Sequence, residues 1–206
     1  MFDFLARANR AEDPGGYILR YKDGACDLSL PAGRAVAIDH NAGFFTLLTS
    51  TLPMTPLSFD EVMDLSNAIA RKFEQAGWPR ISHNTIEQDG FGAYSLGGKL
   101  EISGEWRPCD DPNLYASVIV KYFNSLPSGP HIPPVPGNVL PDDYPDRYLI
   151  QVDIGIDDKS LYDEVIALRD ARRIAENGSK DAALSLKDWI DDPDWHPQGW
   201  RGRFIK

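Results

Sequence analysis

Two of the four histidines have neighbours with which they could do chemistry. His40 follows Asp39, and His83 follows Ser82. A serine, a histidine and an aspartate that meet in space can act as nucleophile, base and orienting acid of a hydrolase, whatever their distance along the chain. No histidine pair has metal-ligand spacing, and the patterns HExxH, CxxC and GxSxG are absent. A spatially assembled hydrolase site is therefore a candidate, and solvent-facing loop histidines are the simpler interpretation.

Two groups of carboxylates are candidates for other chemistry. Asp153, Asp157 and Asp158 lie between a predicted strand and a predicted helix, where their oxygens could bind Ca²⁺ or Mg²⁺. Glu101 and Glu105 share a predicted strand, as an acid pair of a glycosidase could, but four residues of strand separate them by about 13 Å on one face. We favour helix capping for the first group and a polar sheet face for the second, and we expect no metal site and no cofactor.

The C-terminal tail places charged residues among large aromatic residues. Trp and Arg are the residue types most enriched at the hot spots of protein interfaces. The candidate binding residues are Asp191, Asp192, Asp194, Trp195, Trp200, Arg201 and Arg203. The competing interpretation is a structural tail whose tryptophans fill the core.

The charge of the chain restricts its partners. The 206 residues carry a formal net charge of −10, with 16 acidic and 11 basic side chains in residues 1–126 and 15 and 10 in residues 127–206. Such a surface repels phosphate backbones and anionic lipids, so neither a nucleic-acid partner nor membrane insertion is expected. A basic protein partner is favoured by charge, because opposite fields speed encounter, while simple solubility is the alternative explanation.

The cysteines and the N-terminus leave the compartment open. Cys26 and Cys109 allow at most one disulfide, and two free thiols are equally consistent with the sequence. Residues 1–10 are too short and too polar for a signal peptide, and no apolar run is long enough to span a bilayer. The sequence as it stands indicates a cytoplasmic protein, whereas prior removal of a signal peptide would make it periplasmic or secreted.

The clearest element is an amphipathic helix over about residues 58–77. Ser58 and Glu61 form a capping box, and Gly77 and Pro79 end the helix. Its apolar face recurs at helical spacing and consists of Phe59, Val62, Met63, Ile69, Ala70 and Phe73. This helix is expected to be the centre on which the strands pack.

Strands are predicted on both sides of this helix. Their β-branched and aromatic stretches are residues 17–21, 25–30, 35–39, 44–52, 99–106, 114–123 and 148–156, with shorter pieces near Ile81 and Tyr94. Asp23-Gly24 predicts a tight hairpin turn between the first two strands. Residues 99–103 alternate polar and apolar, which is typical of a half-buried strand, and in the last stretch Leu149, Gln151 and Asp153 alternate with Tyr148, Ile150, Val152 and Ile154. Residues 1–13 are predicted to form a short helix or a loose arm.

A proline-rich stretch divides the chain. Seven of the 16 prolines fall within residues 127–147, which predicts an extended strap. The expected fold is α+β: an antiparallel sheet packed on one central helix in residues 1–126, the strap, and a strand–helix–helix part in residues 148–206 packed on the core. Ser160 is predicted to cap the first of these two helices and Ser185 the second.

These patterns favour a non-catalytic protein-binding protein. We expect one of the bacterial inhibitor or immunity type, which would neutralise a toxin or an enzyme through its acidic surface. The first alternative is a hydrolase with a site assembled around His40 or His83, and the second is a structural or assembly subunit. The lack of a catalytic motif argues weakly against an enzyme.

Overall fold

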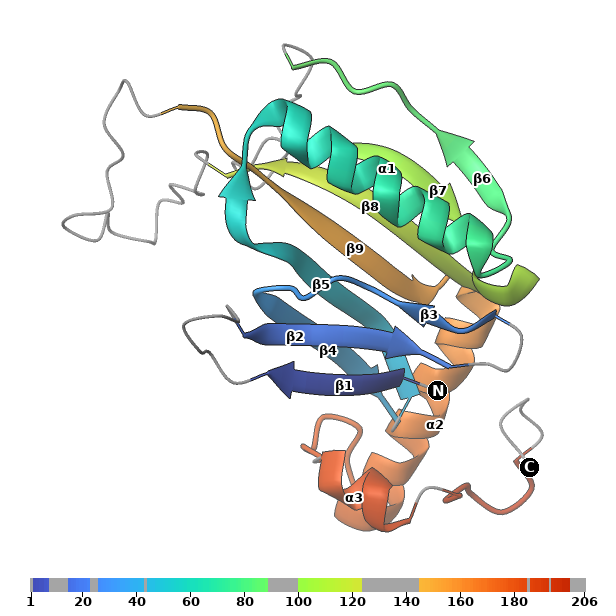
Figure 1. The fold of residues 1–206 in the computed structure, drawn as a ribbon. Helices are drawn as coiled ribbons and strands as arrows, with labels where there is room; N and C mark the ends of the chain where they lie inside the picture. The colour runs from blue at the N-terminus through green and yellow to red at the C-terminus, as the bar shows by residue number, and fades with distance from the viewer. Residues whose placement is uncertain are drawn as a thin grey trace, which may run out of the picture.

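Two antiparallel sheets organise the protein (Figure 1). The computed structural model describes residues 2–7, 15–22, 26–42, 44–88, 100–123, 145–184, 186–192 and 194–200. The small sheet has the order β1 (Phe2–Arg7), β2 (Gly16–Tyr21), β3 (Leu28–Ser29). The large sheet has the order β4 (Ala35–Asn41), β5 (Phe44–Leu57), β9 (Tyr148–Ile156), β8 (Leu114–Tyr122), β7 (Leu100–Trp106), β6 (Arg80–His83). The predicted α+β class and the antiparallel sheet are confirmed.

Helix α1 (Phe59–Gln75) has the predicted capping box. The Ser58 hydroxyl accepts a hydrogen bond from the Glu61 backbone N–H at 3.4 Å, and the Glu61 carboxylate accepts one from the Ser58 backbone N–H at 2.9 Å. Hydrogen bonds from Ser58, the backbone one first, hold the pKa of Glu61 below its ordinary value. Gly77 follows the last turn with φ +77°, in the left-handed region that suits glycine. The predicted helix is confirmed.

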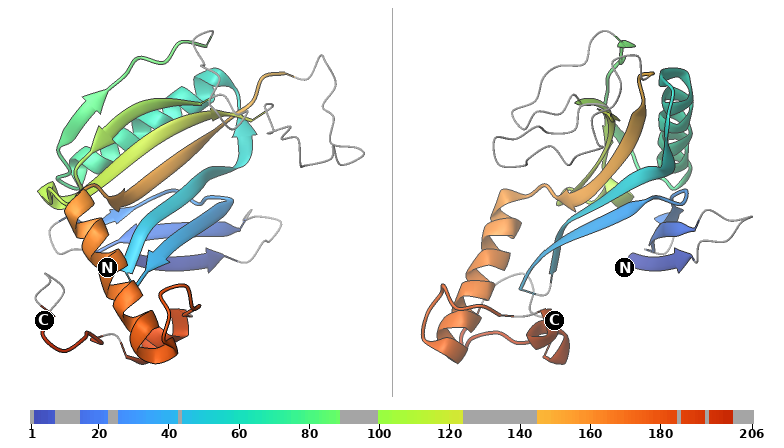
Figure 2. Two further views of the ribbon diagram at one scale, coloured as in Figure 1. Left: turned by 180° about the vertical axis from the view of Figure 1, so that it is seen from behind. Right: turned by 90° about the vertical axis from the view of Figure 1, so that its left-hand side faces the viewer.

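The main core lies between α1 and one face of the large sheet. Figure 2 shows α1 and the small sheet on the same side of the large sheet. Alternate residues of the central strands point into this core, and their side chains are almost completely buried. They are Leu48 and Leu52 of β5, Val118 and Val120 of β8, and Ile150 and Val152 of β9. The small sheet contributes Leu19, Tyr21 and Leu28 to the same cluster.

Strand β9 lies between β5 and β8, although it follows the proline-rich stretch in sequence. Its residues pair with β5 on one side and with β8 on the other over almost its whole length. The strand that begins the C-terminal part of the chain is therefore at the centre of the large sheet. Residues 127–144 of the predicted strap lie outside the described residues.

The N-terminal residues form a strand, so the prediction of a short helix or loose arm is wrong. β1 pairs with β2 from Phe2 opposite Tyr21 to Arg7 opposite Gly16. Backbone hydrogen bonding to a neighbouring strand overrides local propensity here, because an added edge strand satisfies the donors and acceptors of β2. The predicted hairpin pairing of the next two strands is confirmed as β2 with β3, and its turn at Asp23-Gly24 lies outside the described residues.

Helices α2 (Lys159–Asn177) and α3 (Leu186–Asp191) form a second, smaller cluster. α2 leaves the end of β9 and lies on the opposite side of the large sheet from α1 (Figure 2). Its N-cap is Asp158, not the predicted Ser160, because the Asp158 carboxylate accepts hydrogen bonds from the Ser160 and Leu161 backbone N–H groups. Ser185, the predicted cap of α3, lies outside the described residues. No helix of the described part of the chain is long and apolar enough to cross a membrane.

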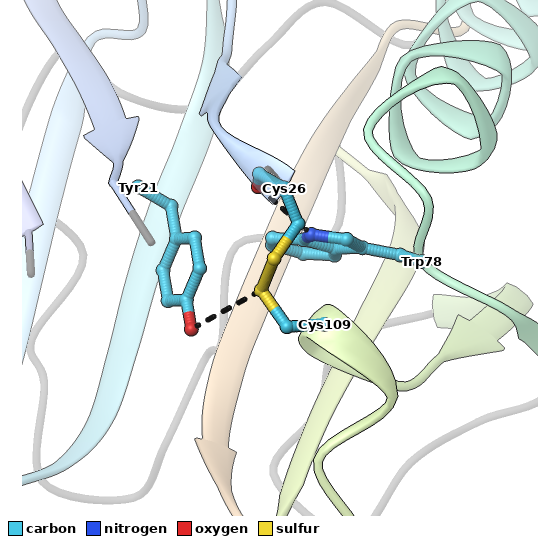
Figure 3. Close-up of a disulfide and its surroundings, with 4 residues drawn as sticks. All are labelled: Tyr21, Cys26, Trp78 and Cys109. Carbon is cyan, nitrogen blue, oxygen red and sulfur yellow. Dashed lines mark hydrogen bonds between the residues drawn. A yellow bond between two sulfur atoms is a disulfide. The ribbon is translucent and has the colours of Figure 1, made fainter. Parts of the chain in front are cut away.

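A disulfide joins the two sheets, which resolves the alternative that the sequence left open. Cys26, just before β3, is bonded to Cys109 in the short helix η3 (Pro108–Asp110) between β7 and β8, with a Cα–Cα distance of 5.6 Å. Two aromatic side chains lie beside the bond (Figure 3). The Trp78 indole N–H donates to the Cys26 carbonyl at 3.2 Å, and the Tyr21 hydroxyl lies 3.7 Å from the Cys109 sulfur.

Candidate functional site

The candidate site is the face of the large sheet that points away from α1. No described helix or strand lies over β6, β7 and β8 on this side, and α2 leads away from the end of β9 (Figure 2). We call this surface the open face. Its side chains alternate along each strand with those that enter the main core, so a single strand supplies both faces.

A row of polar side chains crosses the open face. Cross-strand pairing places Glu105 of β7 opposite Ser117 of β8, and Ser117 opposite Asp153 of β9. The row continues to Thr49 of β5 on one side and Ser82 of β6 on the other. Directly paired residues point to the same face, so hydroxyls and carboxylates alternate across five strands. The distance from the first of these strands to the last is about 19 Å. We call these five residues the polar row.

Hydrogen bonds fix the carboxylates of the polar row. The Thr49 hydroxyl donates to one Asp153 oxygen at 2.7 Å, and the Gln151 amide donates to both Asp153 oxygens at 2.8 and 2.7 Å. The Ser82 hydroxyl donates to Glu105 at 2.9 Å. Hydrogen bonds to a charged acceptor are stronger than neutral ones and hold the acceptor in one orientation. The row is therefore a preorganised arrangement of negative charge. Ser117 and Asp153 at its centre are buried, with 5% and 9% of their surface exposed, whereas Ser82, Glu105 and Thr49 are partly exposed.

Tyr115 lies on the same face, next to the row. It is paired with Gly155, and a Cβ placed on that glycine would be 2.9 Å from a ring carbon of Tyr115 and 3.1 Å from its hydroxyl. The phenol ring therefore lies directly over the glycine. Burial first, and then the negative charges of Asp153, Asp157 and Glu105, raise the pKa of Tyr115 above its ordinary value of 10.0.

This shift predicts a loss of stability in alkali that depends on Tyr115. Above about pH 10 the unfolded chain releases the phenolic proton while the folded chain keeps it, so the free energy of unfolding falls as pH rises through this window. We expect Tyr115→Phe to reduce this fall, as measured by urea unfolding at about pH 8 and about pH 10.5. Tyr17→Phe, at an exposed tyrosine, is the control. The same slope in wild type and Tyr115→Phe would contradict the assignment.

No family model, curated protein or solved structure matches this chain.

The polar row is better suited to recognition than to catalysis. Glu105 and Asp153 have one strand between them, which puts their backbones about 10 Å apart, near the spacing of an inverting glycosidase pair. Both Asp153 oxygens already accept hydrogen bonds, and the row lies on the face of a sheet. Shallow pockets among the described residues lie elsewhere, near Trp78 and near Lys72 at the end of α1. No group of three or more His, Cys, Asp and Glu in the described ranges could hold a metal ion.

The residues of the predicted hydrolase site lie at opposite edges of the large sheet. Asp39 and His40 are on β4, whereas Ser82 and His83 are on β6, and the four other strands lie between them. Five inter-strand spacings amount to about 24 Å, too far for a shared site. The Ser82 hydroxyl instead donates to Glu105 of the polar row.

The predicted acid pair on β7 does not share a face. The register of β7 against β8 shifts between Ile102 and Gly104, so that Glu101 is opposite Val120 and Glu105 is opposite Ser117. Val120 points into the main core and Ser117 to the open face. A one-residue bulge reverses the alternation of a strand, and the expectation that Glu101 and Glu105 lie on one face is wrong.

Two C-terminal tryptophans, Trp189 and Trp195, contact the chain's own Arg172. The Arg172 guanidinium carbon lies 4.5 Å from the ring centre of Trp189 and 5.4 Å from that of Trp195, and the side chain also donates to Glu176 at 2.6 Å and to the Asp192 carbonyl at 3.2 Å. We call this arrangement the Arg172 clasp.

The other predicted binding residues of the tail have separate environments. Trp195 and Trp200 are partly buried against the smaller cluster of α2 and α3. Asp191 forms an ion pair with Lys187, and Asp192 and Asp194 are exposed. Arg201 and Arg203 lie outside the described residues. A binding role for the tail stays a prediction.

Removal of the arginine from the clasp should release α3 from α2. Arg172→Met keeps an apolar side chain but loses the charge and its hydrogen bonds, so we expect a loss of about 2–3 kcal/mol in the stability of the C-terminal part. Faster proteolysis around α3 would show this release, with Arg71→Met at an exposed site of α1 as the control. Equal proteolysis rates in the two variants would contradict a stabilising role for the clasp.

The open face could be anticipated only in part. The strand over residues 148–156 was predicted, and the structure shows that it is buried on both sides, with Leu149 and Asp153 only 7% and 9% exposed. The contributions of Ser82, Glu105, Ser117 and Thr49 depend on the order and register of five strands, which no local pattern specifies.

Proposed function

We propose that the protein is a non-catalytic protein-binding protein that docks its partner on the open face. The observation that carries this proposal is the polar row: charged and hydroxyl side chains are held in register across five strands on a face that no described helix covers over β6, β7 and β8. The cross-strand hydrogen bonds from Thr49 and Ser82 hold the two carboxylates in fixed orientations, so a partner would meet a preorganised row and lose little entropy in ordering it.

The acidity of the chain supports a role of the inhibitor or immunity type. A net charge of −10 would attract a basic toxin or enzyme, and complementary charges raise the association rate. A row about 19 Å long, whose three central strands β7, β8 and β9 are seven to nine residues long, is also comparable in extent to one side of a standard protein–protein interface.

The test uses a substitution that blocks the centre of the open face. The full chain, immobilised and exposed to lysate of its native organism at low and at physiological salt, should retain one stoichiometric and salt-sensitive partner. Ile119→Arg on β8 introduces a bulky side chain beside Gln151 and should weaken this partner's affinity at least about tenfold.

The control for this test is Asp64→Arg, which makes a larger change of charge at an exposed site of α1 on the other side of the sheet. Circular dichroism checks that both variants are folded. Absence of any partner, or a partner that Asp64→Arg weakens and Ile119→Arg does not, would refute docking on the open face.

A further inference from the structure

We propose that the outer edge of β4 pairs with the same edge of a second copy of this chain and so joins two large sheets into one. Such pairing is independent of the proposed function, because the open face over β6, β7 and β8 lies at the other end of the strand order. β4 is the last strand of the large sheet, and within the described residues it pairs only with β5. Its outer backbone N–H and C=O groups therefore face no described strand and are available to a further one.

The opposite edge of the large sheet is protected against such pairing, whereas β4 is not. β6 has four residues, a bulge at Ile81, and Arg80, which forms an ion pair with Glu74 at 2.5 Å. Short length, a bulge and charged residues are the usual means by which an edge strand avoids further pairing. β4 has seven residues, none of them Lys, Arg or Pro, and Asp39 is its one carboxylate. The extra residue of the bulge between β4 and β5 is Thr46 on β5, so β4 has no bulge of its own.

Exposed apolar side chains lie along this edge. Ile38 is opposite Leu48 of β5, whose side chain is fully buried, so Ile38 points to the core side of the sheet. Val36, two residues earlier, points to the same side. Ile38 is nevertheless 37% exposed, and Phe45, opposite His40, is 41% exposed. A second copy aligned with β4 would cover part of this apolar surface.

The sequence of β4 is complementary to itself in one antiparallel register. A two-fold axis perpendicular to the sheet keeps each face on its own side, so symmetric pairing has to be centred on a residue. With Ala37 at the centre, Val36 of each copy is opposite Ile38 of the other, and Ala35 is opposite Asp39. Apolar residues then meet on the core side, and the two Asp39 residues stay about 13 Å apart along the strands. Both open faces point to the same side of the combined sheet.

Other symmetric registers fit less well. A centre at Ile38 would bring Asn41 into the pairing, although the Asn41 side chain accepts a hydrogen bond from Arg169 of α2 at 3.0 Å. A centre at Val36 would place the charged Arg34 opposite Ile38. Pairing is therefore expected over the first five residues of β4. An interface of this size is small, so the dimer should be weak, with a dissociation constant of about 10⁻⁵ M.

Sedimentation velocity of the full chain, at concentrations below and above this value, tests the pairing. The wild type should pass from monomer to dimer as its concentration rises, and more readily at high salt, because salt screens the repulsion between two chains of net charge −10. Ile38→Lys places an ammonium group opposite Val36 and should weaken the dimer at least about tenfold. The matched control is Ile81→Lys at a 50% exposed site of β6, which should leave the dimer unchanged. Circular dichroism checks that both variants are folded.

Cross-linking at the two-fold axis tests the register. Ala37→Cys should form a disulfide between two copies under mild oxidation, because the two substituted residues face each other. Ala35→Cys, at another exposed residue on the same side of β4, should not, because its two copies lie about 13 Å apart. The native disulfide stays in place in both variants, since no reductant is used.

A wild type that stays monomeric at every concentration and salt would overturn the pairing. So would a dimer that Ile38→Lys and Ile81→Lys weaken equally, or equal cross-linking of Ala35→Cys and Ala37→Cys. The pairing and the proposed function fail separately, because Ile119→Arg on the open face should leave the dimer unchanged. A dimer that forms although no partner is captured supports the pairing while docking on the open face is wrong. If Ile119→Arg dissociates the dimer and Ile38→Lys does not, the copies associate through the open face and pairing at β4 is wrong.

Discussion

Replacing both cysteines, by Cys26→Ser together with Cys109→Ser, is expected to lower the free energy of unfolding by about 4.5 kcal/mol. The bridge joins residues 83 apart in sequence and therefore removes much conformational freedom from the unfolded chain. It also connects the region before β3 to the turn between β7 and β8, so its loss removes the covalent link between the two sheets. For a chain of this length the melting temperature should fall by roughly 10–15 °C.

Urea unfolding with and without a reductant measures this effect. The wild type in reductant should match the double variant without it, and both should show a steeper dependence on urea because their unfolded chains expose more surface. The circular dichroism of the folded state should be unchanged, since the strands pair without the bridge. Free thiols in the oxidised wild type, or a difference of less than about 1 kcal/mol, would contradict the prediction.

The second large effect is expected for Trp78→Ala, with a loss of about 4 kcal/mol. Trp78 is 1% exposed, and its ring stacks on Phe73 of α1 at 4.9 Å and meets Tyr21 of β2 edge-on at 5.2 Å. The indole N–H also donates to the Cys26 carbonyl (Figure 3). Truncation leaves a cavity where helix, small sheet and disulfide meet, and the rigid bridge limits collapse around it.

Trp78→Phe is the matched control, because it keeps an aromatic ring on Phe73 and removes the indole donor. We expect it to cost about 1–2 kcal/mol, for one buried hydrogen bond and part of the volume. Combination of Trp78→Ala with the loss of the disulfide should deviate from additivity by more than about 0.5 kcal/mol, because the two features are in contact. Equal stabilities of Trp78→Ala and Trp78→Phe would show that the ring packing contributes little.

Local sequence determined the elements whose signals repeat within a few residues. The capping box and apolar face of α1 are set by contacts three and four residues apart, so the helix was predictable from its first residue to Gly77. Strands β4, β5, β7, β8 and β9 follow from β-formers and alternation, and the acidity follows from composition alone.

Tertiary structure alone decided which strands are neighbours and which side chains meet. It placed β9 between β5 and β8, and it placed His40 and His83 at opposite edges of the large sheet. A bulge in β7 turned Glu101 and Glu105 to opposite faces. Tertiary structure also paired Cys26 with Cys109. The physical reason is that strand order and register are fixed by burying one whole face of the sheet under α1 and the small sheet, a condition that involves residues far apart in the chain. The polar row on the opposite face is a consequence of that burial, because each residue that enters the core turns its neighbours outward.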